Sequence, residues 1–161
     1  LDAVEKQLFQ RLAAIDGRMQ VQFDEAVGLA SQFNTEQAAK LITQQIDPLL
    51  EDGWRPEDVA LLTTGARHPE QVSLQESEGQ VGYWRTFWDK DCVFYGHVLG
   101  CKGLERKVVV LCVNESTPRE RARERLYVGL SRATDKLVVV GPRDVILEMG
   151  GPAVARRLGI A

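Results

Sequence analysis

The sequence lacks several features that would assign it to a class at once. It has no GxxxxGK[ST] phosphate-binding loop, no CxxC pair, no signal peptide and no apolar run of the length, about 18 residues, that marks a membrane span. An odd number of cysteines argues against a disulfide framework and a zinc site, and we expect them to be small buried hydrophobes: Cys92, Cys101 and Cys112. We therefore expect a cytoplasmic protein without membrane contact or bound metal.

The chain also lacks an excess of positive charge. Its 20 Lys and Arg residues and 23 Asp and Glu residues give a net charge of −3. Any nucleic-acid contact must therefore come from a local basic cluster or from a partner domain. With 161 residues, of which 44% are hydrophobic and 27% charged, the sequence has the size and composition of one globular domain with a core.

The hydrophobic pattern predicts an α/β fold with a mostly parallel sheet. Continuous apolar runs are typical of strands covered on both faces, and they occur at 58–63, 92–97, 107–113 and 136–141. A short alternating run predicts an edge strand at 19–23. Helical spacing predicts helices over 2–15, over 34–51 and over the arginine-rich stretch that ends at 131–133. The second of these should kink or stop near Asp47, because a proline follows. One or two short helices are predicted within 142–161.

The segment from 64 to 91 gives the weakest signal. Its first part, TTGARHP at 63–69, leaves the carboxyl end of a predicted strand, where open α/β sheets place ligands. Thr63, Thr64, Arg67 and His68 are candidates for a phosphate contact there, and we assign the first three to nucleic acid. The simpler interpretation is a polar surface loop. For the aromatic side chains that follow, the spacing favours the buried side of a short helix over base stacking: Tyr83, Trp84, Phe87 and Trp88.

One acidic pair resembles a catalytic motif. Asp24 and Glu25 follow the predicted edge strand, as the magnesium-binding acids of nucleotide hydrolases follow theirs. Such a pair needs a phosphate-binding loop upstream, and the sequence has none. We therefore do not assign Asp24 and Glu25 to a site.

Two adjacent stretches carry the clearest signal. CKGLERKVVVL (101–111) places Lys102, Gly103 and Glu105 in a short polar loop before an apolar strand. RERLYVGLSRATDKLVVVG (123–141) places Arg132 after an amphipathic helix and before another apolar strand. The first stretch resembles motif V, and the second motif VI, of superfamily 1 helicases of the UvrD/Rep type. The two occur in the family's order.

The resemblance implies a role for each of these residues. Arg132 matches the arginine finger that contacts the γ-phosphate of ATP, and a planar guanidinium suits the charge of a phosphoryl-transfer transition state. Glu105 matches the glutamate that binds the ribose, and Lys102 and Gly103 shape its loop. A helix-capping surface arginine and a solvated glutamate are the simpler alternatives. The nucleotide interpretation requires Arg132 and Glu105 to lie on the same side of the sheet.

The sequence departs from motif V at the residues that contact DNA. The family's histidine position, three before the lysine, holds Leu99, and its threonine position, five before the lysine, holds His97. His97 lies at the carboxyl end of a predicted strand, so it is a candidate for the DNA contact. A histidine with a purely structural role is an equal alternative.

The resemblance implies a RecA-like fold and the second motor lobe of an ATP-dependent DNA helicase or translocase. We expect a monomeric piece of a longer protein, inactive alone, that begins at Leu1 and has a missing or reduced inserted subdomain at 64–91. A first lobe would bind most of the ATP and Mg²⁺, and single-stranded DNA would be the track. The alternative is a degenerate lobe that serves as an interaction or regulatory module without ATP turnover. A small-molecule enzyme is disfavoured, because no paired acid, nucleophile or glycine-rich cofactor loop occurs.

Overall fold

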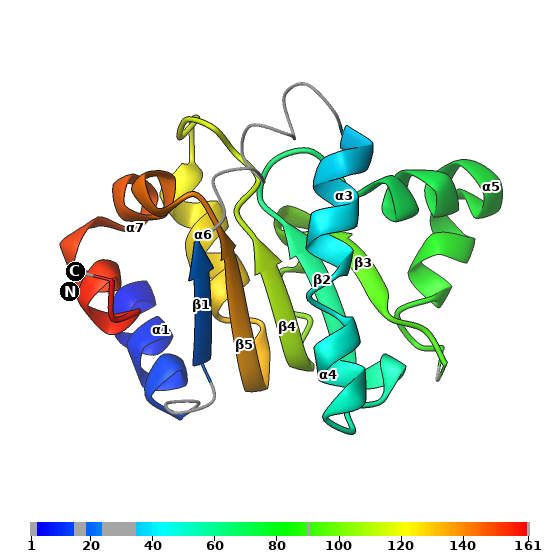
Figure 1. Cartoon of the computed structure of the whole chain (residues 1–161), viewed down its shortest axis with the longest axis horizontal. Helices are drawn as coiled ribbons and strands as arrows, with labels where there is room; N and C mark the ends of the chain where they lie inside the picture. The colour runs from blue at the N-terminus through cyan, green and yellow to red at the C-terminus, as the bar shows by residue number, and fades with distance from the viewer. Residues whose placement is uncertain (1–2, 15–18, 24–34, 90, 161) are drawn as a thin grey trace.

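Five parallel strands form the centre of the protein in a computed structural model (Figure 1). The structure describes residues 3–14, 19–23, 35–89 and 91–160. The strands are β1 (Met19–Phe23), β2 (Val59–Thr63), β3 (Phe94–His97), β4 (Arg106–Cys112) and β5 (Ala133–Gly141). They lie in the order β1-β5-β4-β2-β3, and every neighbouring pair is parallel. The predicted α/β fold with a parallel sheet is confirmed.

Helices cover both faces of this sheet. They are α1 (Ala3–Ala14), α3 (Thr35–Thr43), α4 (Asp47–Glu51), α5 (Pro69–Arg85), α6 (Ala122–Leu130) and α7 (Arg143–Arg157), with short 3₁₀ turns η1 (Pro56–Asp58) and η2 (Val98–Cys101). Alternate strand residues point to opposite faces, so each strand contributes to two cores. One core joins the sheet to α1, α5, α6 and α7, and the other joins it to α3 and α4, which lie in front of the sheet in Figure 1.

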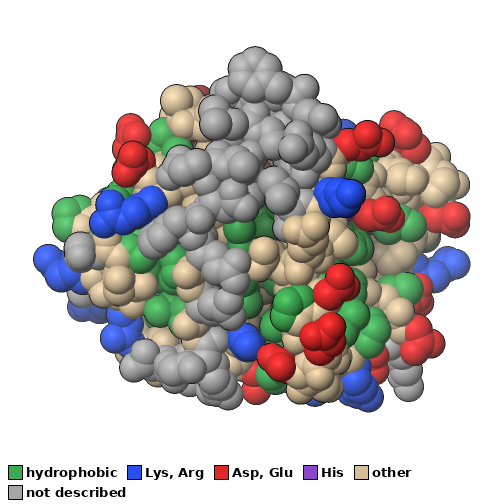
Figure 2. Space-filling view, in the orientation of Figure 1, with side chains coloured by type: hydrophobic (Ala, Val, Ile, Leu, Met, Phe, Trp, Pro, Cys, Tyr) green, Lys and Arg blue, Asp and Glu red, His purple; other side chains and the backbone are tan. Residues whose placement is uncertain are grey.

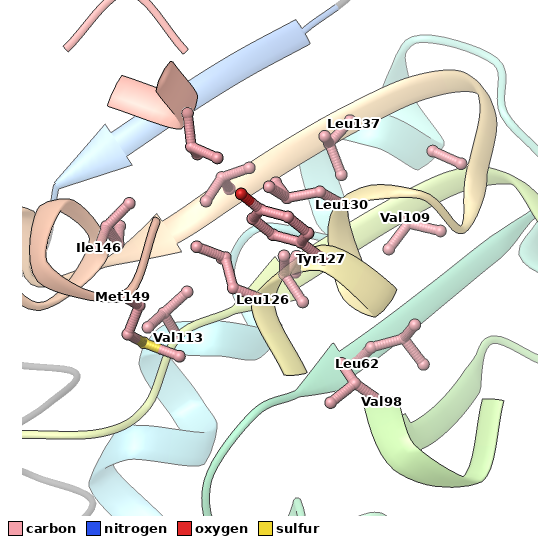
Figure 3. Packing of buried hydrophobic residues seen from close by; sticks show 14 of the residues in the cluster. Leu62, Val98, Val109, Val113, Leu126, Tyr127, Leu130, Leu137, Ile146 and Met149 are labelled. Carbon is pink, nitrogen blue, oxygen red and sulfur yellow. The ribbon is translucent and has the colours of Figure 1, made fainter. Parts of the chain in front are cut away.

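Helix α6 is fixed to the sheet by a stripe of apolar side chains. Ala122, Leu126 and Leu130 recur at every fourth position and are buried, as the sequence predicts. Figure 3 shows Leu126 and Leu130 among the apolar side chains of the sheet. The chain that runs through Arg132 into β5 therefore leaves a helix that is packed against the sheet.

Gly129 lets α6 approach β4 closely. A Cβ atom added at Gly129 would collide with the side chain of Leu111, which is fully buried. We expect Gly129→Ala to destabilise the fold by about 1–3 kcal/mol, the usual cost of overpacking a core, despite the higher helix propensity of alanine. Urea unfolding measures this, and Gly100→Ala is the control, because its added Cβ would lie at an ordinary 3.5 Å from Trp84. Equal stabilities for the two variants would contradict the prediction.

The helix predicted over 34–51 is two helices. A turn at 44–46 separates α3 from α4, and Pro48 lies in the first turn of α4, where its missing N–H costs nothing. The predicted break near Asp47 is thus confirmed. Leu50, in the second helix, is 36% exposed.

Residues 64–91 contain a helix that begins well before the short helix predicted from the aromatic spacing. Helix α5 begins at Pro69, and the side chain of His68 caps it by accepting a hydrogen bond from the Glu70 N–H (3.1 Å). The hydrophobic periodicity was weak because Gly79 interrupts the helix with a φ of 67°. We expect the inserted subdomain to be missing or reduced in this segment, and the structure has helix α5 there.

The aromatic and cysteine predictions are right in part. Tyr83 and Phe87 are buried against Phe94, but Trp88 is 73% exposed, because α5 ends at Arg85 and the chain turns there. Cys101 and Cys112 are buried, whereas Cys92 is partly exposed. Among the described helices, none has the length and hydrophobicity to cross a membrane. Asp24 and Glu25 lie outside the described residues.

Candidate functional site

The predicted site residues lie at two opposite edges of the sheet. Because all strands are parallel, their amino ends share one edge and their carboxyl ends the other. Lys102 and Glu105 precede β4 and Arg132 precedes β5, so these three lie at the amino edge. Thr63 and His97 are the last residues of β2 and β3, at the carboxyl edge. The predicted nucleotide group and the predicted nucleic-acid group are therefore separate sites.

Arg132 is held by the backbone at the end of α6. Its Nε donates to the Val128 carbonyl (3.1 Å), and its Nη1 donates to the Leu104 carbonyl (3.1 Å). Its Nη2 donates to the Ser131 hydroxyl (2.9 Å). These bonds leave further N–H groups of the guanidinium available, since arginine carries five. The side chain is thus oriented without being neutralised.

The charge of Arg132 has no carboxylate within ion-pair distance among the described residues. Half-burial lowers the pKa of Arg132, and the positive charge of Arg11 lowers it further. Glu105 acts in the opposite direction from nearby. The bond to Leu104, next to Glu105 in the chain, places Arg132 and the KGLE loop on the same side of the sheet. Arg132 thus lies beside the loop that carries Glu105, and the nucleotide interpretation stays a prediction.

The remaining residues of the KGLE loop are engaged in ion pairs or in a turn. Glu105 pairs with Arg11 of α1, and Lys102 donates to Glu124 of α6 (2.6 Å). Gly103 has a φ of 81°, a conformation that favours glycine, and no atom lies within 4 Å of the position of an added Cβ. Its role in this structure is to form the turn, not to permit a close approach.

A pocket of about 390 Å³ opens beside this loop. Arg132 and Ser131 line it, together with two arginines that the sequence did not single out, Arg11 and Arg123. Arg123 is fixed by Glu5 and by the Tyr127 hydroxyl (2.8 Å). Arg11 comes from α1, far from the motifs in sequence, so only the folded chain shows that it belongs to this group.

A second pocket, of about 610 Å³, lies at the carboxyl edge. Arg67 and His97, both predicted for nucleic acid, line it, and so does Arg119 from the loop after β4. Asn114 ties that loop to the end of β2 by accepting from the Gly65 N–H (2.8 Å) and donating to the Ala66 carbonyl (2.9 Å). Asn114 and Arg119 were not predicted, because they lie in the polar segment between the two motifs.

Other residues that were predicted to contact a ligand at this edge are buried or engaged within the protein instead. Thr63 and Thr64 are 0% and 1% exposed, so their hydroxyl groups are shielded from a ligand outside. His97 accepts from the Leu99 N–H at Nδ1 (3.2 Å), and its Nε2 bonds to the Thr64 carbonyl (3.1 Å). Both ring nitrogens are thus engaged within the protein, and burial lowers the pKa of His97. This arrangement favours the structural alternative for His97.

A buried ion pair lies beneath the carboxyl-edge pocket. The side chain of Glu115 is 1% exposed and accepts from Arg125 Nη2 of α6 (2.5 Å). Arg119 approaches the same carboxylate at 3.5 Å from a largely exposed position. The pair links the loop after β4 to α6. Among the described residues, no group of His, Cys, Asp and Glu side chains has a metal-binding arrangement.

Comparison with known proteins agrees with the motifs. Residues 97–140 match the model of the UvrD-like helicase C-terminal domain, so the resemblance seen in the sequence is confirmed for that segment. Among solved structures, the chain is similar to the C-terminal domain of a possible DNA helicase from Lactobacillus plantarum WCFS1. The identity is 16%, the TM-score is 0.49, and the alignment covers 87% of this chain and 84% of that chain. No curated protein matches the sequence significantly.

Proposed function

We propose that the chain acts as the second motor lobe of an ATP-dependent DNA helicase or translocase. The observation that carries this proposal is the position of Arg132. Its guanidinium is oriented by backbone carbonyls, faces a pocket and has no carboxylate partner among the described residues. A fixed, uncompensated guanidinium is the group that a transferring phosphoryl group requires.

The neighbouring residues have complementary roles in this proposal. Glu105 accepts a hydrogen bond from a ribose hydroxyl, and Lys102 and Gly103 hold the loop that presents it. A first lobe supplies the phosphate-binding loop and the acids for Mg²⁺, so ATP binds between the two lobes. Binding closes the lobes and hydrolysis opens them, which moves the protein along single-stranded DNA.

The carboxyl edge is the proposed site of DNA contact. Arg67 and Arg119 are exposed there and line one pocket, so they are placed to meet phosphate groups. Figure 2 shows Asp and Glu side chains gathered over the region of α3, α4 and α5, a surface that repels a polyanion. The path of the DNA therefore runs over the pocket and avoids that acidic region. Thr63 and Thr64 support the edge from inside, and His97 holds its backbone.

Binding of single-stranded DNA tests this assignment. In the protein that contains both lobes, we expect Arg67→Ala to weaken binding of an oligothymidylate, and to lower the slope of log K against log salt by about 0.7, the value for one phosphate contact on a single strand. Fluorescence anisotropy at several salt concentrations measures both quantities. Arg85→Ala, which removes an exposed arginine from the end of α5, is the matched control. An unchanged salt slope for Arg67→Ala would place the DNA elsewhere.

A further inference from the structure

Arg11 lies beside Arg132 although it comes from the other end of the chain. Both side chains line the pocket at the amino edge, and Arg11 reaches Glu105 of the KGLE loop. The positive charge of Arg11 is close enough to lower the pKa of Arg132. Two guanidinium groups from different elements therefore face one cavity, next to the proposed ribose contact.

The surroundings leave this cavity positive. Glu124 is the one carboxylate among the pocket-lining residues, and it is already bound by Lys102 (2.6 Å) and Arg121 (2.8 Å). Arg123 pairs with Glu5. Bringing Arg11 and Arg132 together costs electrostatic energy that a polyanionic ligand in the cavity would recover.

The contact between Arg11 and Glu105 is easily exchanged. Their side chains are 28% and 44% exposed, and ion pairs at such positions contribute little to stability. Helix α1 does not depend on this contact, because Leu8 and Leu12 are buried and Glu5 is bound to Arg123 and Tyr127. Arg11 is thus able to change partners while α1 stays in place.

We propose that Arg11 is a second phosphate-binding arginine of the nucleotide site, paired with Glu105 until ATP binds. This inference rests on the proposed function of the site. A phosphate oxygen replaces the carboxylate at Arg11, and the released Glu105 accepts a hydrogen bond from the ribose. Arginine and phosphate form a charge-assisted pair that is stronger than the exposed pair it replaces. One exchange therefore links recognition of the phosphates to recognition of the sugar.

The experiment compares ATP binding by variants of the protein that contains both lobes. We expect Arg11→Gln to raise the Kd for a non-hydrolysable ATP analogue about tenfold, which is the effect of losing one hydrogen bond to a charged group. The control is Lys6→Gln, which removes the same charge from an exposed position of the same helix that lies outside this pocket. Arg11→Lys, which keeps the charge, should recover part of the affinity.

A Glu105→Gln background separates phosphate contact from positioning. If Arg11 binds phosphate, Arg11→Gln still weakens binding of the analogue in that background. Loss of the effect there, or tighter binding by Arg11→Gln alone, would show that Arg11 only holds Glu105 and would overturn the inference. If Arg132→Ala weakens binding and Arg11→Gln does not, only the inference fails. If neither variant changes binding, the proposed function fails as well.

Discussion

Replacing Arg132 with alanine in the protein that contains both lobes is expected to reduce the rate of ATP hydrolysis by a factor of about 10³–10⁵, the contribution of an arginine finger. The reason is the arrangement of this side chain. Val128, Leu104 and Ser131 already orient the guanidinium, so no further ordering is needed when charge develops on the γ-phosphate. A steady-state ATPase assay with saturating single-stranded DNA measures the loss.

Two further variants test whether the loss of ATP hydrolysis comes from the guanidinium of Arg132. Arg132→Lys keeps the charge but loses the fork of donors, so most of the activity should still be lost. Arg156→Ala removes an exposed arginine of α7 and should leave the rate unchanged. If hydrolysis by Arg132→Ala stayed near that of the unmodified protein, the chain would be the degenerate interaction module instead of a motor lobe. Circular dichroism of each variant shows whether the fold is kept.

The parts of the fold that could be predicted depend on local patterns. The runs at Val108–Val110 and Val138–Val140 predicted buried parallel strands because every residue in them is apolar, and both faces of β4 and β5 are covered. Only the aromatic end of helix α5 was predicted, because the rest of its sequence is polar, contains Gly79 and buries few side chains. Where a helix buries only a few, widely spaced side chains, hydrophobic periodicity carries little information.

The same distinction applies to the candidate sites. Arg132 and Glu105 could be found because each lies in a motif and precedes a strand, and parallel strands bring those starts to one edge. Arg11 could not be found, because its place beside Arg132 results from the packing of α1 on α6. The sequence also could not show that Thr63 and Thr64 are buried, because threonine occurs both on loop surfaces and at buried strand ends.

Removing the carboxylate of Glu115 is expected to destabilise the fold by about 3–5 kcal/mol, the cost of leaving one member of a buried ion pair without its partner. In Glu115→Gln, Arg125, a residue that is 8% exposed beneath the carboxyl-edge pocket, loses its counter-charge. Arg119 cannot compensate, since it carries the same charge as Arg125. Urea unfolding measures the change, and Glu57→Gln, in the partly exposed pair with Arg55, should cost less than about 1 kcal/mol.

Replacing both members distinguishes the cost of an orphaned charge from the value of the pair. Glu115 Oε2 and Arg125 Nε have no hydrogen-bond partner among the described residues, so the pair is only partly satisfied. A partly satisfied buried pair recovers little of its desolvation cost. The double variant Glu115→Leu with Arg125→Met should therefore be more stable than Glu115→Gln and close to the unmodified chain. A double variant as unstable as Glu115→Gln would mean instead that the pair itself stabilises the contact between the loop after β4 and α6.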